Sequence, residues 1–242
     1  HDGAIFDYVG DQQRLESEIA KFNPDDIAGY RAFVSYSEKI YKKAFTELAD
    51  HSFHSVWEML KVAPDLVRLR AEQSVYQRVS SFIKDDRLRM IFTFEPLLIG
   101  GNPLRSSAIY SMIHYLEKTW GVHFAMGGTG ALVNGLVKMF EEIGGCLRLD
   151  SRVDEIVVEG GRVQGVRLAD GTSLVADVVV SNGDVANTYR KLIKPEHRRK
   201  WTDRRLERMR YAMSLFVIYF GTNRTYPHLP HHGIILGPRY HG

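Results

Sequence analysis

The chain has 242 residues, enough for one large domain or two modest ones. Hydrophobic residues make up 44% of it and charged residues 25%, which excludes an intrinsically disordered chain. The net charge of +3 is too small to predict a nucleic-acid partner, and a single cysteine, Cys146, excludes an internal disulfide. No apolar run approaches the roughly 20 residues that span a bilayer, and no signal peptide is recognised. We therefore expect a cytoplasmic protein in a reducing compartment.

The first half of the chain is predicted to be mainly helical. A short strand over residues 4–9 precedes a helix over 11–21, and Asn23 to Asp26 then cap a long helix over about 27–48. Its aromatic stripe predicts core packing; the alternative is a wall lining an apolar substrate channel. Further helices are expected over 56–63, from Pro64 onward, over 85–98 and over 106–119.

Residues 61–89 form a basic, amphipathic part of this helical half. Such helices can lie on a membrane surface, with cations on phosphates and apolar groups among the acyl chains. An ordinary solvated helix face is the alternative. Glu58 and Lys61 stand three positions apart on one predicted helix. They are candidates for an acid/base pair near a substrate, or else form a surface salt bridge.

The second half opens on Gly127 and Gly128, followed by a helix that ends at Gly144-Gly145. Strand-like runs cover residues 146–153, and a hairpin is predicted over 157–168 around a Gly160-Gly161 turn. Residues 174–180 are almost continuously apolar, which predicts a strand covered on both faces. This run ends at Ser181-Asn182-Gly183, where small residues would let a flat ligand approach the backbone at the end of a strand.

The remaining residues predict helices over 186–193 and 194–210, then strands over 211–221 and 233–236. A loop carries His228, His231 and His232, which we interpret as exposed histidines because no other ligand pattern supports a metal site. Two cofactor motifs are near misses. Gly128-Thr129-Gly130 lacks the last glycine of a dinucleotide fingerprint, and the run from Gly130 to Gly135 lacks the lysine of a P-loop.

The segment 153–182 resembles the flavin-domain core of the phytoene desaturase family, the bacterial and fungal carotene desaturases. The residues that carry the resemblance are Val153, Ile156, Val163, Gly165, Val166, Leu168, Asp170, Gly171, Ala176, Asp177, Val179, Val180, Ser181 and Asn182. Further matches lie at Phe22-Asn23-Pro24, Gly100-Gly101-Asn102-Pro103, Ile109-Tyr110, residues 127–133, Thr188-Tyr189-Arg190 and Gly237-Pro238-Arg239-Tyr240. The family's N-terminal dinucleotide fingerprint and C-terminal flavin segment have no counterpart here, so we expect an internal fragment, inactive alone.

The resemblance implies an α/β (mixed α+β) fold, the middle part of a Rossmann-like FAD domain with a helical insert and part of a substrate-domain sheet. Residues 1–49 and 199–242 would belong to the substrate domain, 50–125 to the insert with its membrane-contact region, and 126–198 to the FAD domain. Val153 would contact the adenine end of FAD through its backbone. Ser181, Asn182 and Gly183 would lie beside the cofactor, and Gly127 and Gly128 where the insert rejoins the flavin domain.

The resemblance also implies the activity: FAD-dependent desaturation of a C40 carotene such as phytoene in carotenoid biosynthesis, by a peripheral membrane protein. Such an apolar polyene offers almost no polar handle, and its burial at about 0.8 kcal/mol per CH₂ would account for its affinity. Two other interpretations stay open. One is a related flavin amine oxidase or protoporphyrinogen oxidase-like enzyme with a more polar pocket, and the other is a non-catalytic lipid-binding fragment.

Overall fold

The computed structural model describes residues 3–51, 54–212, 215–230, 232–237 and 240. The chain divides into two compact units. We call His1–His123 with Ala212–Gly242 the helical unit, and Phe124–Tyr211 the sheet unit. The assignment of residue ranges to a substrate domain, an insert and an FAD domain stays a prediction.

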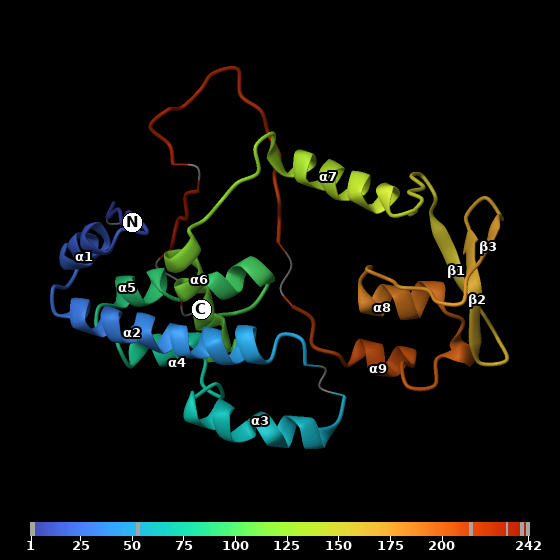
Figure 1. Cartoon of the computed structure of the whole chain (residues 1–242), viewed down its shortest axis with the longest axis horizontal. Helices are drawn as coiled ribbons and strands as arrows, with labels where there is room; N and C mark the ends of the chain where they lie inside the picture. The colour runs from blue at the N-terminus through green and yellow to red at the C-terminus, as the bar shows by residue number, and fades with distance from the viewer. Residues whose placement is uncertain (1–2, 52–53, 213–214, 231, 238–239, 241–242) are drawn as a thin grey trace. The chain divides into compact units, whose positions relative to one another are not determined.

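The helical unit is built from one long helix and several shorter ones (Figure 1). Its α-helices are α1 (Gln12–Ala20), α2 (Asp26–Tyr41), α3 (Val56–Arg68), α4 (Val75–Ser80), α5 (Asp86–Ile91) and α6 (Met112–Trp120). A π-helical turn over Lys42–Glu47 extends α2, and short 3₁₀ helices lie at Glu95–Ile99 and Ala108–Ser111. The predicted long helix is therefore confirmed, and α2 packs against α6 and α1.

Side-chain caps explain where several of these helices begin. Asp11 accepts a hydrogen bond from the backbone N–H of Arg14 at the start of α1. Ser55 and Glu58 form a reciprocal capping box at the start of α3, and Ser74 and Gln77 form another at α4. Each cap satisfies N–H groups that have no partner within the first helical turn.

The core of the helical unit is aromatic at its centre. The ring of Phe92, which is fully buried, stacks on Tyr30 with centroids 5.1 Å apart, and it also packs against Phe6 and Phe33. The buried members of this core are Leu15, Ile19, Tyr30, Phe33, Tyr36, Ile40, Val75, Val79, Ile83, Leu88 and Phe92. Tyr30, Phe33, Ser37 and Ile40 of the predicted stripe thus lie in the core, whereas Phe45 is 49% exposed. The alternative role of the stripe as a channel wall stays a prediction.

Helix α2 approaches the segment after α4 at unusually close range. A Cβ atom added to Gly29 would lie 2.0 Å from the carbonyl oxygen of Phe82. One turn earlier, the buried Asp26 carboxylate accepts hydrogen bonds from the backbone N–H groups of Lys84 and Asp85, at 2.7 and 2.8 Å. Glycine at position 29 therefore allows the contact that Asp26 holds in place.

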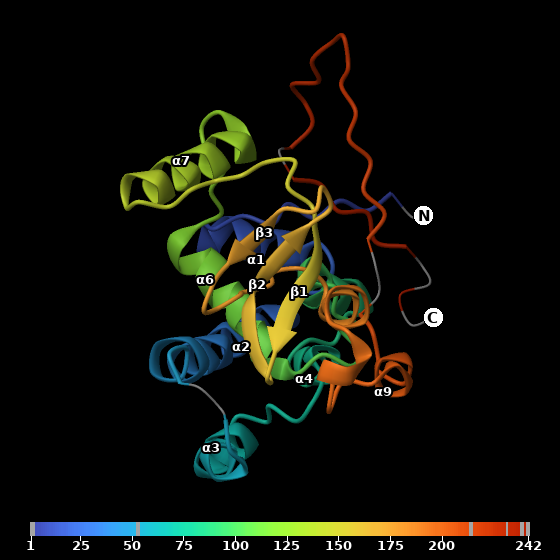
Figure 2. The same cartoon turned by 90° about the vertical axis from the view of Figure 1, so that its right-hand side faces the viewer.

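The sheet unit combines α7 (Gly128–Glu142) with a small antiparallel sheet. Its strands are β1 (Val153–Glu159), β2 (Arg162–Leu168) and β3 (Ser173–Val175), and two short helices follow, α8 (Val185–Asn187) and α9 (Asp203–Glu207). β2 lies between β1 and β3 (Figure 2). The hairpin predicted around Gly160 and Gly161 is confirmed, because Glu159 pairs with Arg162 across that turn.

Several predicted elements are wrong. Of the strand expected over 174–180, only the first two residues lie in β3, and residues 176–180 have no ladder partner among those described. Residues 4–9, 146–149, and the described parts of 211–221 and 233–236 are not strands either. An extended segment becomes a strand only when a neighbouring segment pairs with its N–H and C=O groups over several residues. Ala176 still donates its N–H to the Gln164 carbonyl at 3.1 Å, but the regular ladder of the described residues ends with β3.

Three helix predictions also need correction. The helix expected over 85–98 is divided into α5, which ends at Ile91, and the 3₁₀ helix Glu95–Ile99. Pro64 does not begin a new helix but lies inside α3, which continues past it with one backbone donor fewer. Residues 194–210 form a 3₁₀ turn at Pro195–His197 and the short α9, because Pro195 and the cap residue Thr202 divide the segment. None of the helices in the described part of the chain has the length and apolar character required to cross a bilayer.

Candidate functional site

The residues predicted to contact a flavin all belong to the sheet unit. Gly127 and Gly128 have left-handed backbone angles, φ +82° and +84°, at the start of α7. Val153 is the first residue of β1 and is half-buried. The structure therefore places these residues at the ends of elements, where the backbone can be reached.

Ser181, Asn182 and Gly183 are exposed and lie in the segment between β3 and α8. The Ser181 hydroxyl bonds to the Thr188 hydroxyl at 2.8 Å and also accepts the N–H of Gly183. The carboxylate of Asp184 caps α8 through the N–H of Asn187. This small polar loop is thus ordered by its own hydrogen bonds, while its outer face stays open.

These residues fit a flavin nucleotide in their accessibility and chemistry. The N–H of Gly128 donates to the Ala125 carbonyl at 2.8 Å, and no side chain caps the start of α7, so the N–H groups that follow Gly128 in the first turn could face an anionic group. A Cβ atom added to Gly128 would meet nothing within 4 Å, which leaves open space beside the backbone. The contact of any single residue with a flavin stays a prediction.

Helix α3 carries the acid/base candidates Glu58 and Lys61. The Glu58 carboxylate accepts hydrogen bonds from the backbone N–H groups of His54 and Ser55 at 2.8 and 3.0 Å, and Lys61 is exposed. Glu58 therefore caps its own helix in this structure. A catalytic role for the pair stays a prediction.

The apolar side of α3 is exposed to an unusual degree. Val56, Trp57 and Val67 are 74%, 76% and 64% exposed, and the helix has no buried residue. The helix is tied to the unit by an ion pair from Asp65 to Lys43 and, just beyond its end, by a hydrogen bond from the Tyr36 hydroxyl to the Leu69 carbonyl. An exposed patch of this kind indicates a surface that meets another apolar phase or partner.

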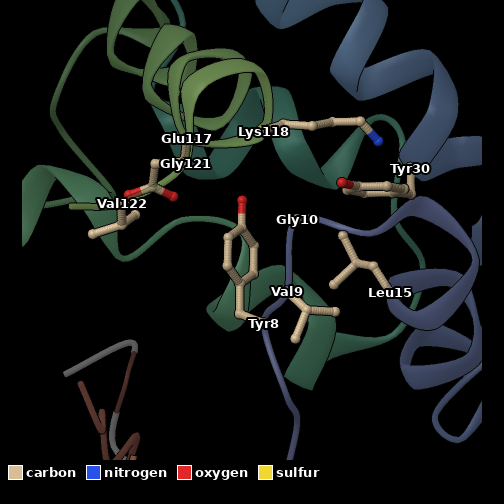
Figure 3. Close-up of a pocket in the computed structure, with 9 residues that line it drawn as sticks. All are labelled: Tyr8, Val9, Gly10, Leu15, Tyr30, Glu117, Lys118, Gly121 and Val122. Carbon is tan, nitrogen blue, oxygen red and sulfur yellow. The ribbon is translucent and has the colours of Figure 1, made fainter. Parts of the chain in front are cut away.

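A cavity of about 150 Å³ lies in the helical unit, near the start of the chain (Figure 3). Its walls are Tyr8, Val9, Gly10, Leu15, Tyr30, Glu117, Lys118, Gly121 and Val122. The Tyr8 hydroxyl and the Glu117 carboxylate point toward one another, and the Lys118 ammonium lies 5.5 Å from the centre of the Tyr30 ring (Figure 3). Drug-sized ligands occupy pockets of roughly 300–1,000 Å³, so this cavity is too small for a flavin or a carotene.

A buried polar cluster adjoins the cavity, and the sequence did not predict it. His114 and Glu95 are 1% and 0% exposed, and His114 Nε2 lies 2.5 Å from Glu95 Oε1 and 2.9 Å from the Phe92 carbonyl oxygen. The other ring nitrogen, Nδ1, bonds to the Tyr8 hydroxyl at 3.0 Å. We call Glu95, His114 and Glu117 the buried triad, although Glu117 is only half-buried, because one ligand-type atom from each lies within 4.8 Å of the others.

The electrostatics of the buried triad follow from its burial and its two carboxylates. Burial alone would lower the pKa of His114, but the Glu95 carboxylate outweighs it and raises that pKa above its ordinary value. Burial raises the pKa of Glu117, opposed by the nearby His114. Burial, and then the charge of Glu95, raise the pKa of Tyr8 well above its usual range. The cluster thus favours positive charge at its centre.

The histidine loop is described only in part. His228 and His232 are exposed, and His231 lies outside the described residues, as do Pro238 and Arg239 of the C-terminal match. Tyr240 is described, and its hydroxyl bonds to the Thr93 hydroxyl at 2.6 Å. Among the described residues, the side chains of the buried triad lie close enough together to hold a metal ion.

A comparison with protein families places this geometry in context. The family model for flavin-containing amine oxidoreductases matches residues 1–240. The chain belongs to this family. The structure combines helices with a small antiparallel sheet, and the matched family contains flavin. Both findings agree with the mixed fold class and the flavin dependence that the resemblance implied.

Among curated proteins, this member of the family is similar to several named desaturases. It is 48% identical over 98% of its length to a phytoene desaturase (lycopene-forming) of Pseudescherichia vulneris, and 44% identical over 98% to one of Pantoea ananas. It is 42% identical over its whole length to a phytoene desaturase (neurosporene-forming) of Cereibacter sphaeroides. It covers 48%, 48% and 47% of these proteins, so the chain spans about half the length of the curated relatives it matches.

Proposed function

We propose that the chain is part of an FAD-dependent desaturase that removes hydrogen from a C40 carotene such as phytoene. The observation that carries the proposal is 48% identity over 98% of the chain to a phytoene desaturase, within a flavin-containing family. Because the chain spans about half of that relative, the activity is proposed for the whole protein. Expression of the full-length gene in cells that accumulate phytoene should yield coloured polyenes with fine-structured visible absorbance; colourless cells with abundant soluble protein would contradict it.

We further propose that the sheet unit is the middle part of a Rossmann-like FAD domain. When bound, FAD supplies the hydride acceptor, so the protein has to provide binding and orientation. Val153 would contact the adenine end through its backbone, and Ser181, Asn182 and Gly183 would lie beside the cofactor. The open outer face of this polar loop and the uncapped start of α7 support that placement.

Replacement of Asn182 in the full-length protein tests the cofactor placement. Asn182→Leu should reduce the flavin retained after gel filtration, because it replaces a polar, hydrogen-bonding group by a branched apolar one. The matched control is Asn187→Leu, an exposed asparagine on α8, which should retain flavin as the unchanged protein does. Equal occupancy in both folded variants would remove Asn182 from the site.

We propose that α3 brings the protein into contact with the membrane that holds its apolar substrate. The exposed side chains of Val56, Trp57 and Val67 would enter the acyl boundary, while Lys61 and Arg68, also exposed, would lie near lipid phosphates. The protein would then be cytoplasmic and peripherally membrane-associated. Co-sedimentation with liposomes should rise with anionic lipid and fall with salt; binding indifferent to both would contradict the proposal.

One alternative function is favoured by a specific observation. The matching family is that of the flavin-containing amine oxidoreductases. A flavin amine oxidase-like activity on a more polar substrate is therefore the second candidate. Supplying the full-length protein with amines and with phytoene in parallel separates the two. Flavin reduction by amines alone would select the second candidate.

A further inference from the structure

The buried triad lies outside the segments proposed to contact flavin and belongs to the other unit of the chain. Glu95 comes from the 3₁₀ helix Glu95–Ile99, whereas His114 and Glu117 come from α6. Residues three apart on a helix share a face, so α6 presents an imidazole and a carboxylate together, and the 3₁₀ helix adds a second carboxylate opposite them. The three ligand-type atoms lie within 4.8 Å of one another.

Glu95 is the residue of the buried triad that lacks hydrogen-bond partners. Its side chain is fully buried, and neither carboxylate oxygen has a hydrogen bond of acceptable geometry among the described residues; only Oε1 has the ion-pair contact with His114. A buried carboxylate oxygen without a partner keeps the full cost of its lost hydration. No lysine or arginine of the described chain pairs with Glu95 or Glu117, and the adjacent Lys118 lies over the Tyr30 ring instead.

The surroundings of His114 orient it as a ligand. The Tyr8 hydroxyl lies 3.0 Å from Nδ1, while Nε2 lies beside Glu95 and donates to the Phe92 carbonyl. In the neutral ring with its proton on Nδ1, that proton is donated to the Tyr8 oxygen and the Nε2 lone pair is free for a cation. A hydrogen bond on the second ring nitrogen is the usual companion of a metal-binding histidine. The Phe92 carbonyl, 2.9 Å from Nε2, adds a further oxygen beside the triad.

The triad borders the cavity. Tyr8 and Glu117 line both the cavity and the cluster, and the Glu117 carboxylate is directed at the Tyr8 hydroxyl in Figure 3. A cavity of about 150 Å³ is large enough for a hydrated cation. Tyr8 and Glu117 thus form the boundary between the cavity and the triad.

We propose that Glu95, His114 and Glu117 bind one divalent transition-metal cation, with the Phe92 carbonyl as a further oxygen ligand. The ligand set of one imidazole nitrogen and carboxylate oxygens suits Zn²⁺ and Mn²⁺. The cation satisfies the unpartnered oxygen of Glu95 and ties the 3₁₀ helix at Glu95 to α6. Its role is structural, and it is independent of the proposed desaturase function.

The test uses the full-length protein, depleted of metal with a chelator and then titrated with Zn²⁺ or Mn²⁺ alone. We expect one cation per chain by elemental analysis after dialysis, and a higher melting temperature in its presence. Glu95→Gln and Glu117→Gln should each weaken the affinity at least about tenfold, and Tyr8→Phe by about 10- to 100-fold through loss of the ring's orientation. His123→Gln, which changes an exposed histidine of the same unit, is the matched control and should bind as the unchanged protein does.

The Glu95→Gln and Glu117→Gln variants keep side-chain volume and remove charge, so they separate loss of metal from loss of fold. Circular dichroism establishes that each variant is folded. Absence of a bound cation at one per chain in the unchanged protein overturns the proposal. So does stoichiometric binding that persists with equal affinity in both folded glutamine variants.

Discussion

Replacing Gly29 by alanine tests the closest backbone contact in the helical unit. In an ordinary helix interior this change stabilises, because alanine is favoured over glycine by about 0.5–1 kcal/mol. Here the added Cβ would lie 2.0 Å from the Phe82 carbonyl oxygen, so α2 and the segment after α4 must move apart. Overpacking of this kind costs about 1–3 kcal/mol.

The same movement strains the hydrogen bonds that Asp26 accepts from Lys84 and Asp85, at 2.7 and 2.8 Å. Hydrogen bonds to a charged group contribute about 1.5–3 kcal/mol each, and partial loss of the pair adds to the overpacking. After subtraction of the helix-propensity gain, we expect Gly29→Ala to lower the free energy of unfolding by about 2–4 kcal/mol.

Urea denaturation followed by circular dichroism measures this change, with Ala32→Gly as the matched control. Ala32 is exposed on the same helix, so its replacement by glycine should cost only the propensity term of about 1 kcal/mol. Both replacements should therefore lower the free energy of unfolding, and Gly29→Ala should lower it by more than Ala32→Gly. A Gly29→Ala protein more stable than the unchanged one would refute the close approach.

Three further predictions address packing, charge and the sheet. Phe92→Ala, which empties the centre of the aromatic core, should lower the free energy of unfolding by about 3–5 kcal/mol in the same urea assay, whereas a loss below about 1 kcal/mol would show that Phe92 is not central. Hydrogen bonds from Arg31 and Gln12 lower the pKa of Glu16 to about 2. The ionised Glu16 therefore stabilises the folded protein above pH 4.5, by about 1 kcal/mol at most because its partner is exposed, and this contribution is lost as the pH falls toward 2. Glu16→Gln should remove that part of the pH dependence, and unchanged acid unfolding would contradict it. Gly165→Ala should disrupt the sheet, because its φ is +140° and a Cβ would lie 1.9 Å from the Leu174 carbonyl oxygen; an unaltered circular dichroism spectrum and melting curve would count against this.

Local signals account for the elements that the sequence predicted correctly. The long helix could be predicted because Asp26 and its neighbours mark its start and the aromatic residues of α2 recur at helical spacing. The β1–β2 hairpin could be predicted because Gly160 and Gly161 supply the two positive φ values of a tight turn, +55° and +79°. Residues 176–180 look like a buried strand in composition, but strand formation depends on a partner that composition does not specify.

The candidate sites show the same division between local and long-range information. The motif residues Gly127, Gly128 and Ser181 could be singled out because small residues at element ends form a local pattern. The buried triad could not, because only tertiary packing brings Glu95 to 2.5 Å from His114 on α6, nineteen residues further along the chain. Its one visible signal was the three-residue spacing of His114 and Glu117, which on its own is common on helices.

Anaerobic mixing of purified full-length protein with phytoene in liposomes tests whether the protein is a carotene desaturase. We expect the blue-light absorbance of the flavin to bleach while polyene bands grow in proportion, since each new C=C bond would give one hydride to the flavin and one proton to a base or to water. Amines added in place of phytoene should leave the flavin oxidised. Flavin that stays oxidised with phytoene, in a protein that binds FAD stoichiometrically, would contradict the assignment as a carotene desaturase.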